Sequence, residues 1–377
     1  MRKTYFIVSF VLFWILISPS SLMAGEGEGG AESENREAHG KEHFNTAGLV
    51  AHHTSDSHDY LVELPFFHKT IHLPVILWTK NGLSIFSSAR FQGDNEGKVV
   101  VNDDKGNRLV RKHEIIYYAD KIEGMEHPSL MDYSLRPLDF SITRNVLAIF
   151  FVFLLLSITL YYARKAYENP KRLPKGVAAV LEPIILFIRD DIAKENIGKH
   201  YEKYMPYLLT VFFFILYSNL IGLIPFAPFG HNLTGNILIT FVLAAIALVV
   251  ILASSNKHYW KHIFTPPVPK LIWIVMVPVE IAGIFIKPFA LMVRLFANIL
   301  AGHTMMISLV ALIFIFESAK WGIVSGIFVV FMSFIELLVA FLQAYIFTVL
   351  TAVFIGLALE EGHEEEHAAE GSIQATR

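Results

Sequence analysis

The chain has 377 residues, of which 54% are hydrophobic and 17% are charged, and its formal net charge is −3 at pH 7. Soluble domains carry about 25% charged residues, so this balance indicates a membrane protein with a soluble part attached. The net charge gives no support for a nucleic-acid partner. The chain has no cysteine, which excludes disulfides and thiolate metal sites.

Residues 1–24 have the layout of a secretory signal peptide. Arg2 and Lys3 precede an apolar run, and Ala24 stands where cleavage would follow. An uncleaved anchor helix is the alternative, and either one sends the following residues across the membrane. Residues 25–59 begin with a stretch rich in Gly and Glu, which predicts a flexible linker because it offers little apolar surface to bury.

Residues 60–140 predict a small extracytoplasmic β-rich domain. Short apolar or alternating runs are separated by turn signals at 80–82, 93–95 and 103–106. The expected strands are 61–67, 73–78, 83–91, 98–102 and 113–119. Histidine is frequent here, but only His68 and His72 have ligand-like spacing, so packed or solvated histidines fit better than a metal site.

Residues 141–362 predict an all-α integral membrane domain with five crossings. Each apolar run is long enough for the roughly 30 Å of hydrocarbon. The expected crossings are 142–163, 205–226, 235–253, 271–316 and 322–359. Between the first two, residues 177–198 predict an amphipathic helix on the membrane surface.

The basic loops predict the orientation of the chain. If residue 25 lies outside, the Lys- and Arg-rich residues 164–199 and the lysines of 257–270 both fall on the cytoplasmic side. The acidic residues 363–377 then form a disordered cytoplasmic tail.

The last two apolar runs are much longer than a perpendicular crossing needs. Residues 271–316 alone would form a helix of about 70 Å. Only residues 317–320 separate this run from the next. The sequence therefore predicts two long, tilted, antiparallel helices.

Polar residues lie at helical spacing within these runs. Glu280, Lys287 and Arg294 follow one another at intervals of seven, and Asn298 lies one turn after the arginine, so they share one stripe. His303 falls on the opposite side, about 13 Å from Arg294 along the axis.

The second long run carries Glu336 and Gln343, again seven apart. In an antiparallel pair that turns near residue 318, Gln343 is expected near Arg294 and Glu336 near His303. Histidine and carboxylate can relay protons, whereas arginine stays charged and cannot. Two such levels fit a gated proton path, because ionisable groups in a membrane normally mark ion routes.

Structural roles remain open for some of these residues. His303 and Glu336 could form a buried hydrogen bond without transport. Lys287 could extend to the interface or pair with Glu280, so these two are a secondary candidate pair.

At these residues the chain closely resembles subunit a of F-type ATP synthases. The match is carried by RLFANILAGH at 294–303, FIE at 334–336 and LQAYIF at 342–347. NLIGLIP at 219–225 and LEEGH at 359–363 fit too. The departure is the extension of residues 25–140, whose role the resemblance does not carry.

The resemblance implies a stator subunit in a bacterial inner membrane, beside a rotating c-ring and a peripheral-stalk subunit b. Arg294 would face the c-ring carboxylate and separate two proton half-channels. Asn298 and Gln343 would flank it, and His303 with Glu336 would line the half-channel open to the periplasm. Other family members carry the acid and the histidine exchanged between these positions. Such a subunit is not itself catalytic and needs no cofactor.

A standalone proton or cation channel, or a secondary transporter, is the competing interpretation. It would explain the intramembrane charges, but the chain lacks the paired repeats expected of many transporters. A receptor with a secreted domain would not need five crossings.

Overall fold

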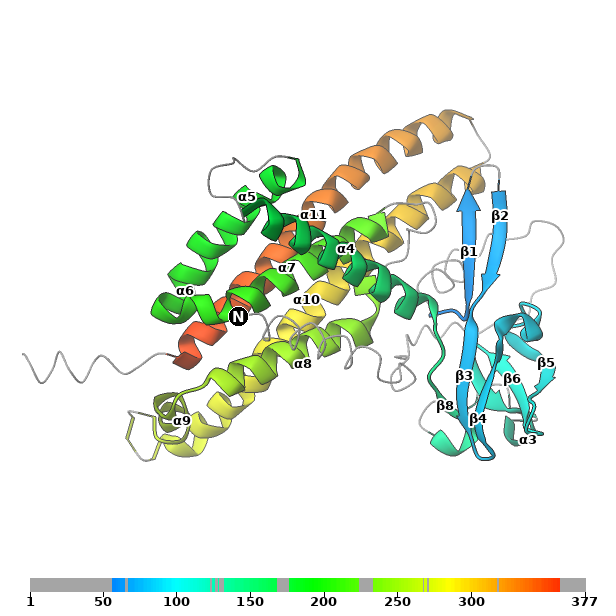
Figure 1. The fold of residues 1–377 in the computed structure, drawn as a ribbon, viewed down its shortest axis with the longest axis horizontal. Helices are drawn as coiled ribbons and strands as arrows, with labels where there is room; N and C mark the ends of the chain where they lie inside the picture. Colours follow the sequence, from blue (N-terminus) through cyan, green and yellow to red (C-terminus); the bar gives the residue numbers. More distant parts are fainter. Residues whose placement is uncertain are drawn as a thin grey trace, which may run out of the picture.

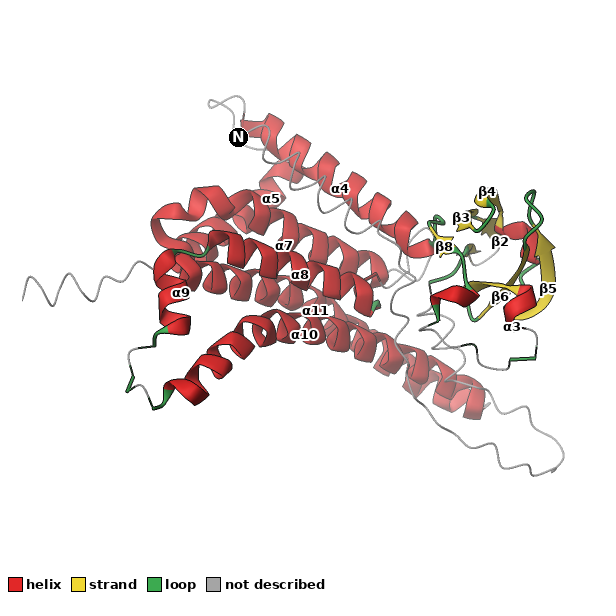
Figure 2. Ribbon diagram, turned by 90° about the horizontal axis from the view of Figure 1, so that it is seen from below, coloured by secondary structure: helices red, strands yellow, loops and turns green. Residues whose placement is uncertain are grey.

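The computed structural model describes residues 56–64, 67–122, 124–125, 128, 132–167, 176–223, 233–266, 268–269, 271–316 and 319–359. The proposed signal peptide, most of the linker and the acidic tail lie outside these ranges. The described residues form a β-rich N-terminal domain and a helical domain, which lie side by side in Figures 1 and 2.

The N-terminal part is β-rich, as the sequence predicts, and its strands form three small antiparallel sheets. One pairs β1 with β2, the second has the order β4-β3-β8, and the third has the order β5-β6-β7. The strands are β1 (Asp59–Leu64), β2 (Phe67–His72), β3 (Pro74–Thr79), β4 (Gly82–Ser87), β5 (Glu96–Asn102), β6 (Arg108–Lys112), β7 (Ile115–Tyr118) and β8 (Leu138–Asp139). Their core includes Val75, Leu77, Phe91 and Leu109, so the last two sheets pack face to face.

One turn differs from the expectation. His113 and Glu114 were expected to begin a strand, but both have positive φ and connect β6 to β7. Neither is glycine, so the sequence signal for a hairpin was weak. Asn95 holds the turn, because its carbonyl accepts from the His113 amide at 3.0 Å and its side chain accepts from the Glu114 amide at 2.6 Å.

Short helical elements complete this part of the chain. They are η2 (Ser88–Phe91), α3 (Ala119–Ile122) and η3 (Tyr133–Leu135).

Five helical segments of the described chain are long and apolar enough to cross a membrane. This number and the chain order agree with the sequence prediction. The helices are α4 (Arg144–Tyr167), α5 (Val177–Phe187), α6 (Glu195–Ile197), α7 (Tyr201–Leu223), α8 (Ile237–Ser254), α9 (Lys257–Phe264), α10 (Trp273–Phe316) and α11 (Ala319–Leu359). Short turns η5 (Gly198–His200) and η6 (Leu233–Gly235) precede α7 and α8.

The predicted surface helix is helical, and one side of it packs against the rest of the helical domain. Between α5 and α6 the backbone widens into a π-helical segment, η4 (Ile188–Lys194). Ile188, Ile192 and Ala193 are completely buried, and η4 and α6 contact α11. Packing of this kind explains the apolar side of the segment, while Asp190 pairs with Lys194 on its polar side.

The two long helices are continuous, as the sequence predicts. α10 has 44 residues and α11 has 41. At 1.5 Å per residue each exceeds about 60 Å, and Figure 1 shows them as a diagonal antiparallel pair that reaches past the other helices. α7 and α8 pack against this pair and form its support.

Opposite ends of the helical domain carry different parts of the chain. One end carries the β domain, the start of α4, the end of α10 and the start of α11. The other end carries α6, α9 and the end of α11 (Figures 1 and 2). At this second end Asn256 caps α11, because its backbone amide donates to the Ala358 carbonyl and its side chain to the Leu359 carbonyl. These bonds satisfy carbonyls that a helix end leaves without partners.

Candidate functional site between α10 and α11

The antiparallel α10–α11 pair brings the predicted polar residues to neighbouring levels. Asn298 Nδ2 donates to Gln343 Oε1 at 2.9 Å. Gln343 is only 2% exposed, whereas Asn298 is exposed. The sequence placed Gln343 at the level of Arg294, but its bonding partner is Asn298, one helical turn further along. The register of the pair is therefore within one turn of the prediction.

Glu336 occupies the next level, two turns before Gln343 on α11. It is 7% exposed, and one of its oxygens, Oε2, has no hydrogen-bond partner among the described residues. The other oxygen, Oε1, lies 2.9 Å from the point where a Cβ on Gly302 would be. The missing side chain of Gly302 thus makes room for a carboxylate between the two helices.

His303 follows Gly302 in α10, and its side chain lies outside the described residues. The backbone nevertheless places residue 303 at the level of Glu336, because the adjacent Gly302 contacts that carboxylate. The expected His–Glu level is therefore consistent with the helix register.

Arg294 lies on an uncovered side of the α10–α11 pair. Its side chain is exposed and forms no hydrogen bond or ion pair with the residues that the structure describes. It lies within a long apolar helix, next to Val293, which is 40% exposed. A guanidinium on an apolar surface has a large unmet need for an anionic or hydrogen-bonding partner.

The α10–α11 surface as a whole is less covered than the supporting helices. Only 17% of the most apolar window of either helix is buried, against 67% for the segment Val177–Leu223. Large apolar side chains are exposed along both helices. They include Phe285, Ile286, Phe289, Phe331, Phe334, Leu337 and Leu338.

Asn219 fixes α11 against α7 near the polar level. Its side-chain amide donates to the Ala340 carbonyl at 3.2 Å and accepts from the Thr234 hydroxyl at 2.6 Å. Ala340 lies one turn before Gln343, so these bonds hold α11 close to the level of Gln343. No local sequence pattern indicates this role, because the partners lie far apart in the chain.

Glu280 and Lys287, the secondary candidates, are not paired with each other among the described contacts. Lys287 Nζ lies 5.4 Å from the centre of the Phe354 ring, which is a cation–π contact. No ion pair links Lys287 to the half-buried Glu280 among the described contacts. Packing on an aromatic ring is therefore the role that the structure supports for Lys287.

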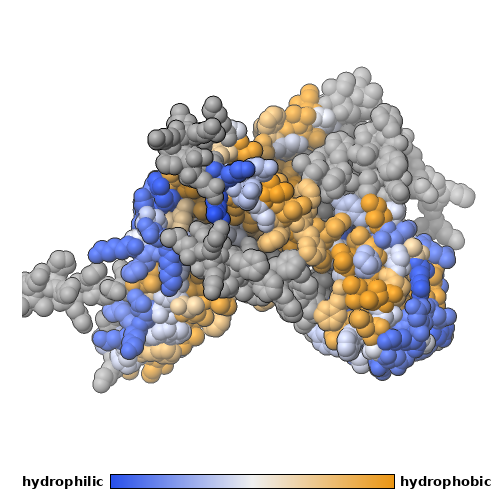
Figure 3. All heavy atoms as spheres, in the orientation of Figure 1, coloured by the Kyte–Doolittle hydropathy of each residue, from blue (hydrophilic) through white to orange (hydrophobic). Residues whose placement is uncertain are grey.

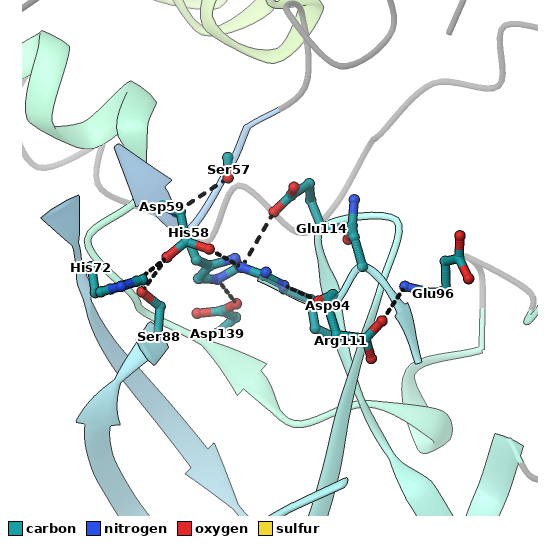
Figure 4. Close-up of polar contacts among 11 residues, drawn as sticks. Ser57, His58, Asp59, His72, Ser88, Asp94, Glu96, Arg111, Glu114 and Asp139 are labelled. Carbon is teal, nitrogen blue, oxygen red and sulfur yellow. Dashed lines mark hydrogen bonds and ion pairs between the residues drawn. The ribbon is translucent and has the colours of Figure 1, made fainter. Parts of the chain in front are cut away.

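A second polar cluster lies in the β domain, and the sequence did not predict it (Figure 4). Arg111 is 2% exposed, and its Nη1 donates to Asp59 Oδ2 at 2.7 Å. Ser88 and His72 also bond to Asp59, at 2.6 and 2.9 Å. Burial alone would raise the pKa of Asp59, but the bonds from Ser88, Arg111 and His72 outweigh it and lower that pKa.

His58 forms the neighbouring pair in this cluster. Its Nε2 lies 3.0 Å from Asp139 Oδ2, and the side chain is 3% exposed. Burial opposes protonation of His58, but the hydrogen bond and charge of Asp139 outweigh burial, so the pKa of His58 is raised. The same bond lowers the pKa of Asp139 against the opposing effect of burial. These pairs are structural, because they join β1 to other strands.

Comparison with known proteins extends these observations. Residues 146–356 match the family model described as ATP synthase A chain, and residues 49–140 match a domain of unknown function, DUF8433. The chain is 45% identical over 236 residues to ATP synthase subunit a of Chloroherpeton thalassium, covering 60% of this chain and 70% of that protein.

Two further relatives agree. ATP synthase subunit a 2 of Chlorobaculum tepidum is 41% identical over 286 residues, which are 72% of this chain and 80% of that protein. ATP synthase subunit a of Myxococcus xanthus is 42% identical over 250 residues, 64% of this chain and 80% of the relative. With more than half of its length matched by the family model, the chain belongs to the ATP synthase A chain family.

Proposed function

We propose that the uncovered α10–α11 surface faces the c-ring and that Arg294 is the residue on this surface that interacts with the rotor carboxylate. As a member of the subunit a family, the chain is the stator part of the ATP synthase membrane sector and couples proton translocation to ATP synthesis. The observation that carries the assignment is the exposed Arg294, which has no described partner within its own chain and lies in a long apolar helix. We place ATP chemistry on other subunits of the complex.

The charge of Arg294 explains how the site works. A protonated rotor carboxyl is neutral and can turn through lipid, whereas a charged carboxylate pays a large desolvation cost there. Arg294 stabilises the carboxylate when it has lost its proton, and it cannot itself give up a proton. It therefore separates two half-channels and prevents protons from passing straight across. Each charge that moves through 100 mV delivers about 2.3 kcal/mol.

The remaining site residues have assigned places around this arginine. Asn298 and Gln343 hold each other one turn from Arg294 and keep the α10–α11 spacing fixed at its level. Glu336 and His303 line the half-channel that opens to the periplasm. The buried Glu336 oxygen without a described partner supports this role, because water or a neighbouring imidazole would complete its bonding.

We further propose on which side of the membrane the other segments of the chain lie. The signal peptide 1–24 and linker 25–59 precede an extracytoplasmic β domain, 60–140, and the membrane domain, 141–362, ends in a cytoplasmic tail, 363–377. The segment 177–198 lies at the cytoplasmic surface, where lipid and subunit b are its neighbours. The supporting observation is that the β domain and the α6–α9 end lie at opposite ends of the helices. A bacterial inner membrane fits this arrangement.

Family membership gives no support to a standalone channel or secondary transporter. A test on the assembled complex is to replace Arg294 by alanine and measure ATP-driven proton pumping in inverted membrane vesicles. We expect Arg294→Ala to abolish coupled pumping, because the rotor carboxylate loses its only permanently charged partner in this site. Passive proton leak is expected to persist or rise.

Lys287→Ala is the matched control, since it removes a different exposed cation from the same helix while the complex keeps its site. The Lys287→Ala complex is expected to pump protons at close to the rate of the unmodified complex. Coupled pumping by an assembled Arg294→Ala complex would refute the assignment.

A further inference from the structure

The two main sheets of the β domain present different outer faces. On the sheet β5-β6-β7 the outward residues include charged side chains, such as Glu96, Lys98 and Arg108. This is the usual state of a sheet that faces water on one side. The sheet β4-β3-β8 is different, because its outward residues carry no ionisable side chain.

We call this second surface the apolar sheet face. Its outward residues are Pro74, Ile76, Trp78, Leu83, Ile85, Ser87, Leu138 and Phe140, of which Ser87 alone has a polar side chain. Trp78 and Ile85 are each 57% exposed, and Leu138 is 51% exposed. The space-filling view in Figure 3 shows apolar residues gathered over β3, β4 and β8.

Strand register makes these side chains one continuous surface. Trp78 lies opposite Leu83 on one side and opposite Leu138 on the other. Ile76 lies opposite Ile85 in the same pairing. Neighbouring outward residues on paired strands contact one another, so the face is a connected patch of the kind that marks an interaction site.

The apolar sheet face is joined directly to the first membrane helix. After β8, the Phe140 amide donates to the Ile76 carbonyl at 2.8 Å, and the Ile142 amide donates to the Pro74 carbonyl at 3.2 Å. Strand-like bonding therefore continues to within two residues of Arg144, the first residue of α4.

The start of α4 is held by the same domain. The Arg144 amide donates to the Ser57 carbonyl at 3.0 Å, and the Asn145 amide donates to the Asp56 carboxylate at 3.0 Å. These bonds cap the helix and leave no free linker between the sheet and α4. The sheet cannot turn away independently of the membrane helix.

The position of the face follows from this attachment. Strands β3, β4 and β8 run across the direction of α7 and α8 in Figure 1, and Figure 2 shows their sheet at the side of the domain where α4 begins. Exposed apolar residues also continue along α4, where Leu147, Phe150 and Leu154 face outward. The lipid-facing side of α4 thus leads onto the outward residues of β8.

We propose that the apolar sheet face rests on the bilayer surface and anchors the β domain in the lipid headgroup region next to α4. Tryptophan and other apolar side chains beside a helix end are typical of this region, where rings lie partly in lipid. The absence of ionisable side chains on this face, in contrast to the sheet β5-β6-β7, distinguishes the lipid-facing side from the water-facing one.

The test uses the lack of cysteine in the chain. Ile85→Cys in the full chain carries a fluorophore, and the protein is placed in nanodiscs of phosphatidylethanolamine and phosphatidylglycerol. Quenching is measured with a nitroxide lipid labelled near the headgroup and, separately, with aqueous iodide. Lys98→Cys is the matched control, because it is an exposed position on a strand of the other sheet.

The label at residue 85 is expected to be quenched by the nitroxide lipid at least about twofold more strongly than the label at residue 98, with the reverse order for iodide. Iodide access equal to that of the control would overturn the proposal, since the face would lie in water. Shielding from both quenchers would also overturn it, since a second copy would then cover the face. Leu83→Cys repeats the measurement if Ile85→Cys does not fold.

Discussion

Two arginines show opposite ways in which a charge is accommodated. Arg111 is buried, and Asp59 and the Asp94 carbonyl accept its hydrogen bonds, so it supports the β domain. Arg294 is exposed on an apolar surface without a described partner. The sequence indicates Arg294 as a candidate site residue, because a cation inside an apolar run is costly and normally marks an ion route. It did not predict Arg111, because a lone arginine in a strand is ordinary.

Gly302 is important because glycine has no side chain and so leaves space for its neighbour. In Gly302→Ala the new Cβ would lie 2.9 Å from Glu336 Oε1, so the carboxylate must move away from the α10–α11 contact. We expect slower ATP-driven proton pumping with a lesser loss than Arg294→Ala causes, measured in inverted vesicles. Gly326→Ala is the control, because nothing lies within 4 Å of its Cβ position. Equal rates in both variants would show that Glu336 does not need this space.

At the scale of elements, periodicity predicted the long helices and most strands, because apolar length and alternation are local properties. The prediction of a strand at His113 and Glu114 was wrong. These residues form a turn with positive φ, which Asn95, from a separate loop, stabilises. The packing of residues 177–197 was also missed. An amphipathic pattern shows that one side is covered, but lipid and α11 would produce the same pattern.

The contact between α6 and α11 gives a prediction for these elements. A Cβ on Gly356 would lie 1.9 Å from the Asn196 carbonyl oxygen, which is a backbone atom and cannot move alone. Gly356→Ala must therefore separate the helices, and overpacking of this kind costs about 1–3 kcal/mol. We expect faster amide hydrogen exchange in α6 and in the last turns of α11. Gly283→Ala, whose Cβ position is open, should leave exchange there unchanged.

For the whole molecule, the sequence predicted a β domain followed by five crossings but not how the two parts are joined. The joint consists of contacts between residues far apart in the chain, such as His58 with Asp139 and Asp56 with Asn145. No local pattern reports such pairs. Their effect is to fasten α4 to the sheet that carries the apolar sheet face, so the β domain and the membrane helix move as one body.

This joint is expected to depend on pH through His58, which faces Asp139, Asp56 and Glu114. Because its folded pKa is raised above 6.5, its stabilising effect is complete below that value and is lost as pH rises through the folded pKa. Amide exchange at Arg144 and Asn145, divided by the unprotected rate, should therefore speed up when the pH is raised from about 6 to about 9. His58→Gln should weaken this dependence. Constant protection over the range in the unchanged chain would contradict the prediction.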